Sequence, residues 1–164
     1  MSNGEKIAMK TLVAWFSATG STAKLAKTLA SAADAELYEI RPAVPYERRD
    51  LNWMDKKSRS TVEMQDPDCR PELADRDAPV AEAERIFLGF PIWWYREPSI
   101  IDSFLEAYDF SGKTIVPFYT SGGSRLGEGQ ERIEKLAVGA RVLPGRRFPA
   151  GAGEEELKSW IETL

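Results

Sequence analysis

The sequence predicts an α/β fold: one doubly wound, five-stranded parallel sheet with helices on both faces. Apolar runs typical of buried strands alternate along the chain with segments whose apolar residues recur at helical spacing. This alternation favours parallel strands joined by right-handed helical crossovers. A chain of 164 residues is long enough to bury the core of such a domain. We therefore expect one domain at 10–164, preceded by a short tail at 1–9.

Five segments have the composition of strands. They are 11–16, 36–41, 85–90, 114–119 and 140–143. The segment 85–90 is almost wholly apolar, as expected for a strand covered on both faces, whereas the charges in 36–41 indicate an edge strand. Pro117 cannot donate a ladder hydrogen bond, so we expect a bulge or a local break in 114–119.

Five segments are predicted to be helical. They are 24–33, 51–64, 98–108, 130–138 and 154–163. The segment 98–108 is the best supported, because its apolar residues follow the i, i+3, i+4, i+7 spacing of one helix face. The helix at 51–64 has only a weak apolar face, and it lies within a long connection, 43–84, that is either a crossover or a functional excursion. There we expect Tyr46 and Trp53 to pack locally, although an exposed Trp53 would act as a lid.

Composition narrows the classes of function. The net charge of −4 argues against a nucleic-acid partner, because such proteins present a basic face. The absence of histidine excludes Ser-His-Asp and Cys-His catalysis and argues against a transition-metal site. Cys69 is the single cysteine, so no intramolecular disulfide can form and a reducing compartment is favoured. No apolar run approaches the roughly 20 residues that span a bilayer. We therefore expect a cytoplasmic protein without a membrane partner.

The turn between the first strand and the first helix is rich in hydroxyl groups. Ser17, Thr19, Ser21 and Thr22 surround Gly20 where the apolar strand stops and the helix begins. Backbone N–H groups, hydroxyl donors and the positive end of a helix dipole meet there, which favours a bound anion. Serine and threonine are also ordinary helix caps, but one of them is enough for a cap. Four hydroxyls around a glycine predict a phosphate site.

Two further unusual loops follow the third and fourth predicted strands. Their candidate binding residues are Pro91, Trp93, Trp94 and Tyr95, and then Ser121, Gly122 and Gly123. Ligands of parallel α/β sheets bind at the carboxyl ends of the strands. An aromatic wall together with a glycine loop predicts a planar aromatic ligand that carries the phosphate. For each tryptophan alone, the alternative is that it caps the core.

Three stretches resemble the flavin-binding segments of the flavodoxin-like proteins common in bacterial genomes. They are 16–22, 88–94 and 112–124, and the resemblance extends from about Lys10 to the C-terminus. It implies a flavodoxin-like fold with strand order 2-1-3-4-5 and FMN as the cofactor, bound between the first and third strands. The first loop would then hold the phosphate, the second would line the isoalloxazine, and the third would approach the other edge of the ring.

The resemblance implies an electron-transfer protein whose FMN cycles between its oxidised, semiquinone and hydroquinone states. Its partners would be redox proteins, a reductase and an acceptor, and it would be a monomer or a weak dimer. One alternative is an enzyme of similar fold, an FMN-dependent NAD(P)H:quinone-type oxidoreductase. Another is a binding module that keeps the fold without a flavin. No side chain is an evident general acid or base, so we expect no catalytic residue and no metal ligand. The sequence also lacks a Walker A lysine and a G-x-G-x-x-G fingerprint, which argues against other nucleotide folds.

Overall fold

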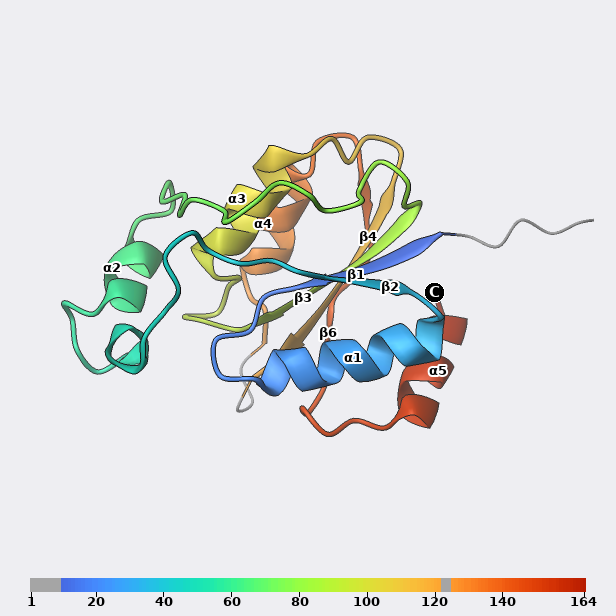
Figure 1. The fold of residues 1–164 in the computed structure, drawn as a ribbon, viewed down its shortest axis with the longest axis horizontal. Helices are drawn as coiled ribbons and strands as arrows, with labels where there is room; N and C mark the ends of the chain where they lie inside the picture. The colour runs from blue at the N-terminus through green and yellow to red at the C-terminus, as the bar shows by residue number, and fades with distance from the viewer. Residues whose placement is uncertain (1–9, 122–124) are drawn as a thin grey trace, which may run out of the picture.

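A parallel sheet organises the protein (Figure 1). The computed structural model describes residues 10–121 and 125–164, so the expected tail at 1–9 lies outside the described residues. The strand order β2-β1-β3-β4-β5 confirms the predicted order, and a short strand, β6, also pairs with β4. The strands are β1 (Thr11–Trp15), β2 (Glu36–Glu39), β3 (Arg85–Pro91), β4 (Thr114–Thr120), β5 (Arg141–Val142) and β6 (Arg146–Arg147).

Helices cover both faces of the sheet, as predicted (Figure 1). α1 and α5 pack together on one face, and α3 and α4 pack together on the other. The helices are α1 (Ser21–Ala33), α2 (Arg59–Gln65), α3 (Ser99–Ala107), α4 (Gly129–Leu136) and α5 (Glu154–Glu162), with a 3-10 helix, η1 (Arg48–Leu51). Within the described part of the chain, no helix is long and apolar enough to cross a membrane.

Side chains of the central strands alternate between two apolar cores, one on each face of the sheet. Leu12 of β1 and Ile86 of β3 lie in the core under α3 and α4. Val13 and Phe87, their neighbours in the sequence, lie in the core under α1 and α5. All four side chains are buried, which explains why these strands read as continuous apolar runs.

Pro117 does not interrupt β4, which pairs with β3 along its whole length. The interruption lies in the strand on the other side of β4. On the other side of β4, the amide of Leu143 donates to the Ile115 carbonyl oxygen (2.9 Å). The amide of Phe148 donates to the Tyr119 carbonyl oxygen, also at 2.9 Å. Pro117 lies between these two bonds and has no N–H to offer. Next to Pro117, the strand that pairs with this side of β4 is divided into two short strands, β5 and β6. The expected break therefore lies in the adjacent strand and not in 114–119.

The connection 43–84, here called the excursion, includes η1 and α2 at one end of the molecule (Figure 1). The predicted helix at 51–64 is wrong in its first half, because α2 begins only at Arg59. Ser58 caps this helix by accepting a hydrogen bond from the amide of Thr61 (3.4 Å). The cap fixes the start of α2 where the apolar pattern was too weak to do so.

Candidate functional site

The first loop, residues 16–20, leads from β1 to the N-terminus of α1. Gly20 is the N-cap of α1 with a φ of +100°, a conformation that a side chain would strain. Its amide donates to Ser17 Oγ (2.9 Å), which closes the loop. The first turn of α1 contains no acidic residue. The positive end of the helix is therefore not neutralised within that turn and is suited to an anion.

The four hydroxyl groups of this region have different surroundings. Thr19 and Ser21 are exposed, and Ser17 is half-buried. Thr22 is buried, and its Oγ1 lies 2.8 Å from Thr120 Oγ1. Thr22 thus connects α1 to the end of β4, whereas the exposed hydroxyls remain accessible to an anion.

β3 ends at the half-buried Pro91, and the residues from Trp93 to Arg96 then form a tight turn, here called the aromatic hairpin. The amide of Trp93 donates to the Arg96 carbonyl oxygen (3.0 Å), and the amide of Arg96 donates back to Trp93 (3.2 Å). Trp94 and Tyr95, at the tip, have φ angles of +50° and +64°. Asparagine and glycine are preferred at such positions because bulky residues are strained there. The chain therefore holds two aromatic residues at a strained tip.

The aromatic residues of the hairpin divide into a base and a tip. Trp93 is half-buried and packs edge-on against Phe16 and Tyr46, with ring centroids 5.8 Å and 5.4 Å away. Trp94 and Tyr95 are 41% and 64% exposed. Trp93 therefore fastens the hairpin to the body of the protein, and the two rings at the tip are left exposed.

A cavity of about 540 Å³ lies between the aromatic hairpin and the excursion. Its walls are formed by Leu51, Trp53 and Ser60 from the excursion and by residues 92–95. Trp53 is 70% exposed, so the expectation that it packs locally is wrong. Because its lining includes four aromatic side chains, the cavity is suited to a flat ligand.

Tyr46, the other aromatic residue singled out in the excursion, packs locally as expected. Its ring contacts Phe16 and Trp93, and Arg59 Cζ lies 3.8 Å from its centroid. Its hydroxyl donates to Glu63 Oε1. Burial, followed by this hydrogen bond, raises the pKa of the Tyr46 phenol, which therefore stays protonated. Tyr46 thus connects the base of the hairpin to α2.

The third loop begins at Ser121, directly after β4. Arg147 donates to the Ser121 carbonyl oxygen from Nη2 (3.1 Å) and to Ser121 Oγ from Nε (3.2 Å). The predicted residues Gly122 and Gly123 lie outside the described residues. Gly127 comes so close to the hairpin that a Cβ there would lie 2.9 Å from the Tyr95 carbonyl oxygen. The third loop and the aromatic hairpin therefore pack against each other, and Arg147 is a cation at this edge that sequence reasoning missed.

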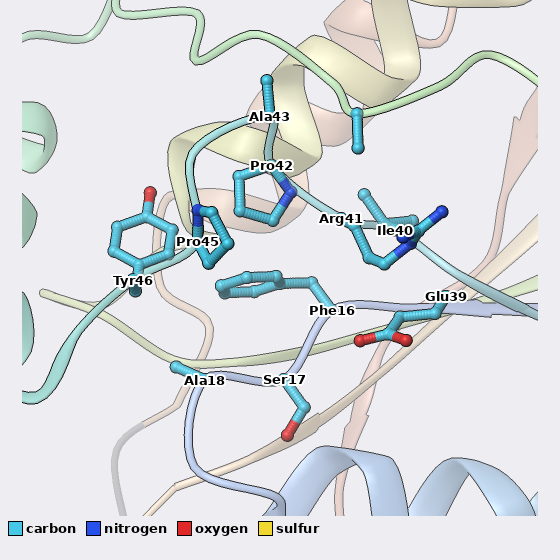
Figure 2. A pocket seen from close by; sticks show the side chains of 11 residues that line it. Phe16, Ser17, Ala18, Glu39, Ile40, Arg41, Pro42, Ala43, Pro45 and Tyr46 are labelled. Atoms are coloured by element: carbon cyan, nitrogen blue, oxygen red, sulfur yellow. The ribbon is translucent and has the colours of Figure 1, made fainter.

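A second cavity, of about 390 Å³, lies beside the first loop, where β1 and β2 end (Figure 2). Figure 2 shows the Phe16 ring extending toward Pro45 and Tyr46, while Ser17 points toward α1. Glu39 lines this cavity from the end of β2. Sequence reasoning missed Glu39, although the carboxyl end of a parallel strand is where ligand-facing residues are expected.

The three loops all follow the carboxyl ends of β1, β3 and β4, which are neighbours in the sheet. Residues 10–164 match the family model described as flavodoxin. The chain belongs to the flavodoxin family. The resemblance identified in the sequence is thereby confirmed, and so is the flavodoxin-like order of the sheet. No curated protein matches the chain significantly.

Solved structures similar to this flavodoxin-family chain share its fold over nearly the whole length. A Bacteroides uniformis protein assigned as a flavoprotein is 46% identical, with a TM-score of 0.89 over 95% of this chain and 99% of that chain. A Bacteroides eggerthii protein with the same assignment is 40% identical, with a TM-score of 0.90 over 96% of this chain and 98% of that chain. A Lactobacillus acidophilus flavoprotein in complex with FMN is 22% identical, and its TM-score of 0.73 over 94% of this chain and 99% of that chain shows the same fold.

Proposed function

We propose that this flavodoxin-family protein binds FMN and acts as an electron-transfer protein. The observation that carries the proposal is that a hydroxyl-rich helix N-terminus and two exposed aromatic rings lie at the same edge of the sheet. The family match and the FMN complex of the Lactobacillus acidophilus flavoprotein support this cofactor. FMN supplies the redox chemistry when bound, while the protein supplies binding, orientation and electrostatics.

The first loop suits a phosphate monoester. The hydroxyls of Thr19 and Ser21 and the first amides of α1 would donate to the phosphate oxygens. A Cβ placed on Gly20 would meet no atom within 4 Å, so the space over this part of the loop is open. A monophosphate needs no lysine here, because hydroxyls, amides and the helix dipole together can balance its charge. The buried Thr22 would stabilise the first loop through its hydrogen bond to Thr120.

The aromatic hairpin would hold the flat ring of FMN. Trp94 and Tyr95 are exposed, and stacking against a flat ligand would remove their apolar surface from water. Aromatic walls also exclude water and lower the local dielectric, which disfavours added negative charge on a bound ring and lowers its reduction potential. Ser121, held by Arg147, would approach the ring or its side chain from the third loop.

We further propose that the protein exchanges electrons with redox partner proteins, a reductase and an acceptor, as a monomer or a weak dimer. The tip of the aromatic hairpin is exposed. A flavin bound beside it would therefore have an edge within reach of a docked protein, without an opening step. This arrangement suits an electron carrier that meets its partners only transiently.

A second candidate function, an FMN-dependent NAD(P)H:quinone-type oxidoreductase, is favoured by the cavity between the aromatic hairpin and the excursion. Its volume of about 540 Å³ would admit a small planar substrate. Trp53 lines this cavity and is 70% exposed, so it would close over such a substrate. In an electron carrier the same tryptophan would have no substrate to cover.

Reconstitution with FMN tests the proposal. Protein freed of any flavin is titrated with FMN and, as the matched control without a phosphate, with riboflavin, and flavin fluorescence is recorded. We expect FMN to bind at least about tenfold more tightly, because the first loop would donate to its phosphate. Protein that binds neither flavin would overturn the proposal.

Steady-state kinetics then separate the two candidate functions. The FMN-loaded protein is supplied with NADPH and a quinone, with and without a flavodoxin reductase. Turnover that requires the added reductase would support the electron carrier. Rapid turnover without it would support the oxidoreductase, and a Trp53→Ala variant should then raise the KM for the quinone.

A further inference from the structure

Four charged residues, three of them buried and one half-buried, form a cluster directly behind the aromatic hairpin. Arg96 is the last residue of the hairpin, Glu97 follows it, Asp102 lies in α3, and Arg132 lies in α4. Glu97 and Asp102 are 0% exposed, and Arg96 is 4% exposed. Charged residues are almost never buried to this extent unless they are paired.

Arg132 binds both carboxyl groups of the cluster. Its Nε donates to Glu97 Oε2 (3.0 Å), and its Nη2 donates to Asp102 Oδ2 (2.5 Å). Nη1 of Arg96 lies 3.5 Å from Asp102 Oδ2 and 3.9 Å from Glu97 Oε2. The two guanidinium groups therefore face one oxygen of each carboxyl group.

The same arginines connect the cluster to the excursion. Nη2 of Arg96 donates to the Met64 carbonyl oxygen (3.1 Å), and Nη2 of Arg132 donates to the Pro67 carbonyl oxygen (3.2 Å). Nη1 of Arg70, also in the excursion, lies 3.7 Å from Asp102 Oδ2. The cluster thus joins four segments that surround the candidate site: the hairpin, α3, α4 and the excursion.

The second oxygen of each carboxyl group has no such contact. Among the described residues, Glu97 Oε1 and Asp102 Oδ1 are buried without a hydrogen-bond partner. Such atoms are unfavourable, and two adjacent carboxylates also repel each other. One proton shared between the two groups would reduce the repulsion and would supply a hydrogen bond between the carboxyl groups. Gly129 leaves room for this arrangement, since a Cβ there would come within 2.9 Å of Glu97 Oε1.

The surroundings of Glu97 would keep such a proton in place at neutral pH. Burial, and then the neighbouring Asp102, raises the pKa of Glu97 to about 9. The charged groups that face the pair are Arg96 from the hairpin, Arg132 from α4 and Arg70 from the excursion, with Glu106 of α3 bound to Arg70. These guanidinium groups favour ionisation, but burial and the second carboxyl group outweigh them.

We propose that Glu97 and Asp102 are positioning residues, which share one proton and thereby hold the aromatic hairpin in its strained conformation. Strained turns persist only where the surrounding contacts over-determine them. The cluster supplies such contacts, because Arg96 belongs both to the hairpin and to the cluster. Loss of the shared proton would leave two buried anions side by side, and their separation would shift Arg96 and the tip residues Trp94 and Tyr95.

Infrared spectroscopy of the flavin-free protein tests for the shared proton. A protonated carboxyl group absorbs apart from ionised carboxylates and shifts in heavy water. We expect one such band at neutral pH, lost in Glu97→Gln and, as a second variant, in Asp102→Asn. Glu106→Gln, which removes a half-exposed carboxylate bound to Arg70, should keep it. Absence of this infrared band from the wild-type protein, or its persistence in both Glu97→Gln and Asp102→Asn, would overturn the proposal.

Fluorine NMR tests whether the pair positions the hairpin. The resonance of Trp94 in 5-fluorotryptophan-labelled protein, assigned with Trp94→Phe, is followed from neutral pH to about pH 10. We expect it to shift in the wild-type protein and to stay nearly constant in Glu97→Gln, whose amide does not titrate. Cys69→Ser is the control, because an ordinary thiol also titrates in alkaline solution and burial raises the pKa of this one. Equal profiles in the wild-type protein and Glu97→Gln would disprove the positioning role.

FMN affinity gives a third readout, and this one rests on the proposed function. At neutral pH we expect Glu97→Ala to weaken FMN binding about tenfold, and Glu97→Gln to change it less than about twofold. Equal binding by the wild-type protein and Glu97→Ala would contradict the positioning role and leave the proposed function intact. If the wild-type protein binds no FMN, the proposed function fails, and the two flavin-free experiments still decide the role of the cluster.

Discussion

The hydroxyl groups of Thr22 and Thr120 lie 2.8 Å apart in buried surroundings, although the two residues are 98 positions apart in the sequence. Thr22 belongs to the first turn of α1, and Thr120 ends β4. Their bond therefore fixes the first loop relative to the third loop. The geometry of a site built from both loops depends on it.

Thr120→Val should destabilise the protein more than Thr120→Ser. Valine has the shape of threonine but leaves the buried Thr22 hydroxyl without a partner, so we expect the free energy of unfolding to fall by about 1–3 kcal/mol. Serine keeps the hydroxyl and should lose less. Urea denaturation measures both variants, and equal losses would show that the Thr22–Thr120 bond contributes nothing.

Thr19→Val and Ser21→Ala should each weaken FMN binding without unfolding the protein. Both hydroxyls are exposed, and a hydrogen bond to a charged phosphate is worth about 1.5–3 kcal/mol, which is about 10- to 150-fold in Kd. Fluorescence titration gives the affinity, and thermal unfolding of the flavin-free variants checks the fold.

Two controls accompany these variants. Riboflavin, which has no phosphate, should bind the variants and the wild-type protein equally. Thr28→Val changes a threonine of the same helix whose hydroxyl bonds within α1, to the Lys24 carbonyl oxygen, and it should leave FMN affinity unchanged. A loss of FMN affinity in Thr28→Val as large as that in Thr19→Val would remove the phosphate assignment.

Tyr95→Asn should stabilise the flavin-free protein and weaken FMN binding. The φ of Tyr95 is +64°, in the region that asparagine tolerates and bulky residues do not, so relief of strain is worth up to about 1 kcal/mol. Tyr95 is 64% exposed, so little buried surface is lost. Met54→Asn, at a residue that is 73% exposed, is the control without a left-handed backbone. A lower melting temperature for Tyr95→Asn than for Met54→Asn would contradict the strain argument.

The stability of the protein should fall as the pH rises from about 4.5 to about 9. The pKa of Glu97 moves from an ordinary value of 4.5 in the unfolded chain to about 9 in the folded one. The folded state therefore binds more protons than the unfolded state in this window, so the free energy of unfolding decreases as the pH rises. Denaturation across this range should show a smaller slope for Glu97→Gln. An identical slope would mean that Glu97 does not carry the proton.

Gly89→Ala should be strongly destabilising. A Cβ at this position of β3 would lie 2.2 Å from Cζ of the buried Phe118 ring. Overpacking of this kind costs about 1–3 kcal/mol or more. Phe118→Leu should therefore destabilise the wild-type protein but partly rescue Gly89→Ala, which a double-mutant cycle would reveal. Additive losses would show that the two side chains do not collide.

Much of the fold could be predicted because its elements carry local signals. The apolar run at 85–90 and the helical stripe through Ile101, Phe104 and Leu105 gave β3 and α3 nearly at their observed bounds. The start of α2 could not be found from apolar spacing, because a single cap residue, Ser58, decides it. The break caused by Pro117 was predicted in its own strand and lies in the adjacent one. The sequence does not show which neighbouring strand would have accepted the hydrogen bond that Pro117 cannot donate.

The candidate site was predictable in its loops but not in its internal contacts. Thr22 and Thr120 meet only because the strand order makes β1 and β4 the two neighbours of β3, and nothing near either residue indicates the other. The left-handed tip at Trp94 and Tyr95 is the opposite of what residue preference predicts. The burial of Glu97 could not be predicted either, because a charged residue in a sequence normally indicates an exposed position.

The side of the sheet beyond β4 offers no continuous ladder to a foreign chain. β5 and β6 have two residues each, and Pro144 and Gly145 stand between them. Fibrillar growth needs a straight row of unpaired N–H and C=O groups to template the incoming segment. On the far side, Glu36 and Glu39 of β2 place negative charge along the other rim. Both rims should therefore disfavour edge-to-edge pairing with another copy of the chain.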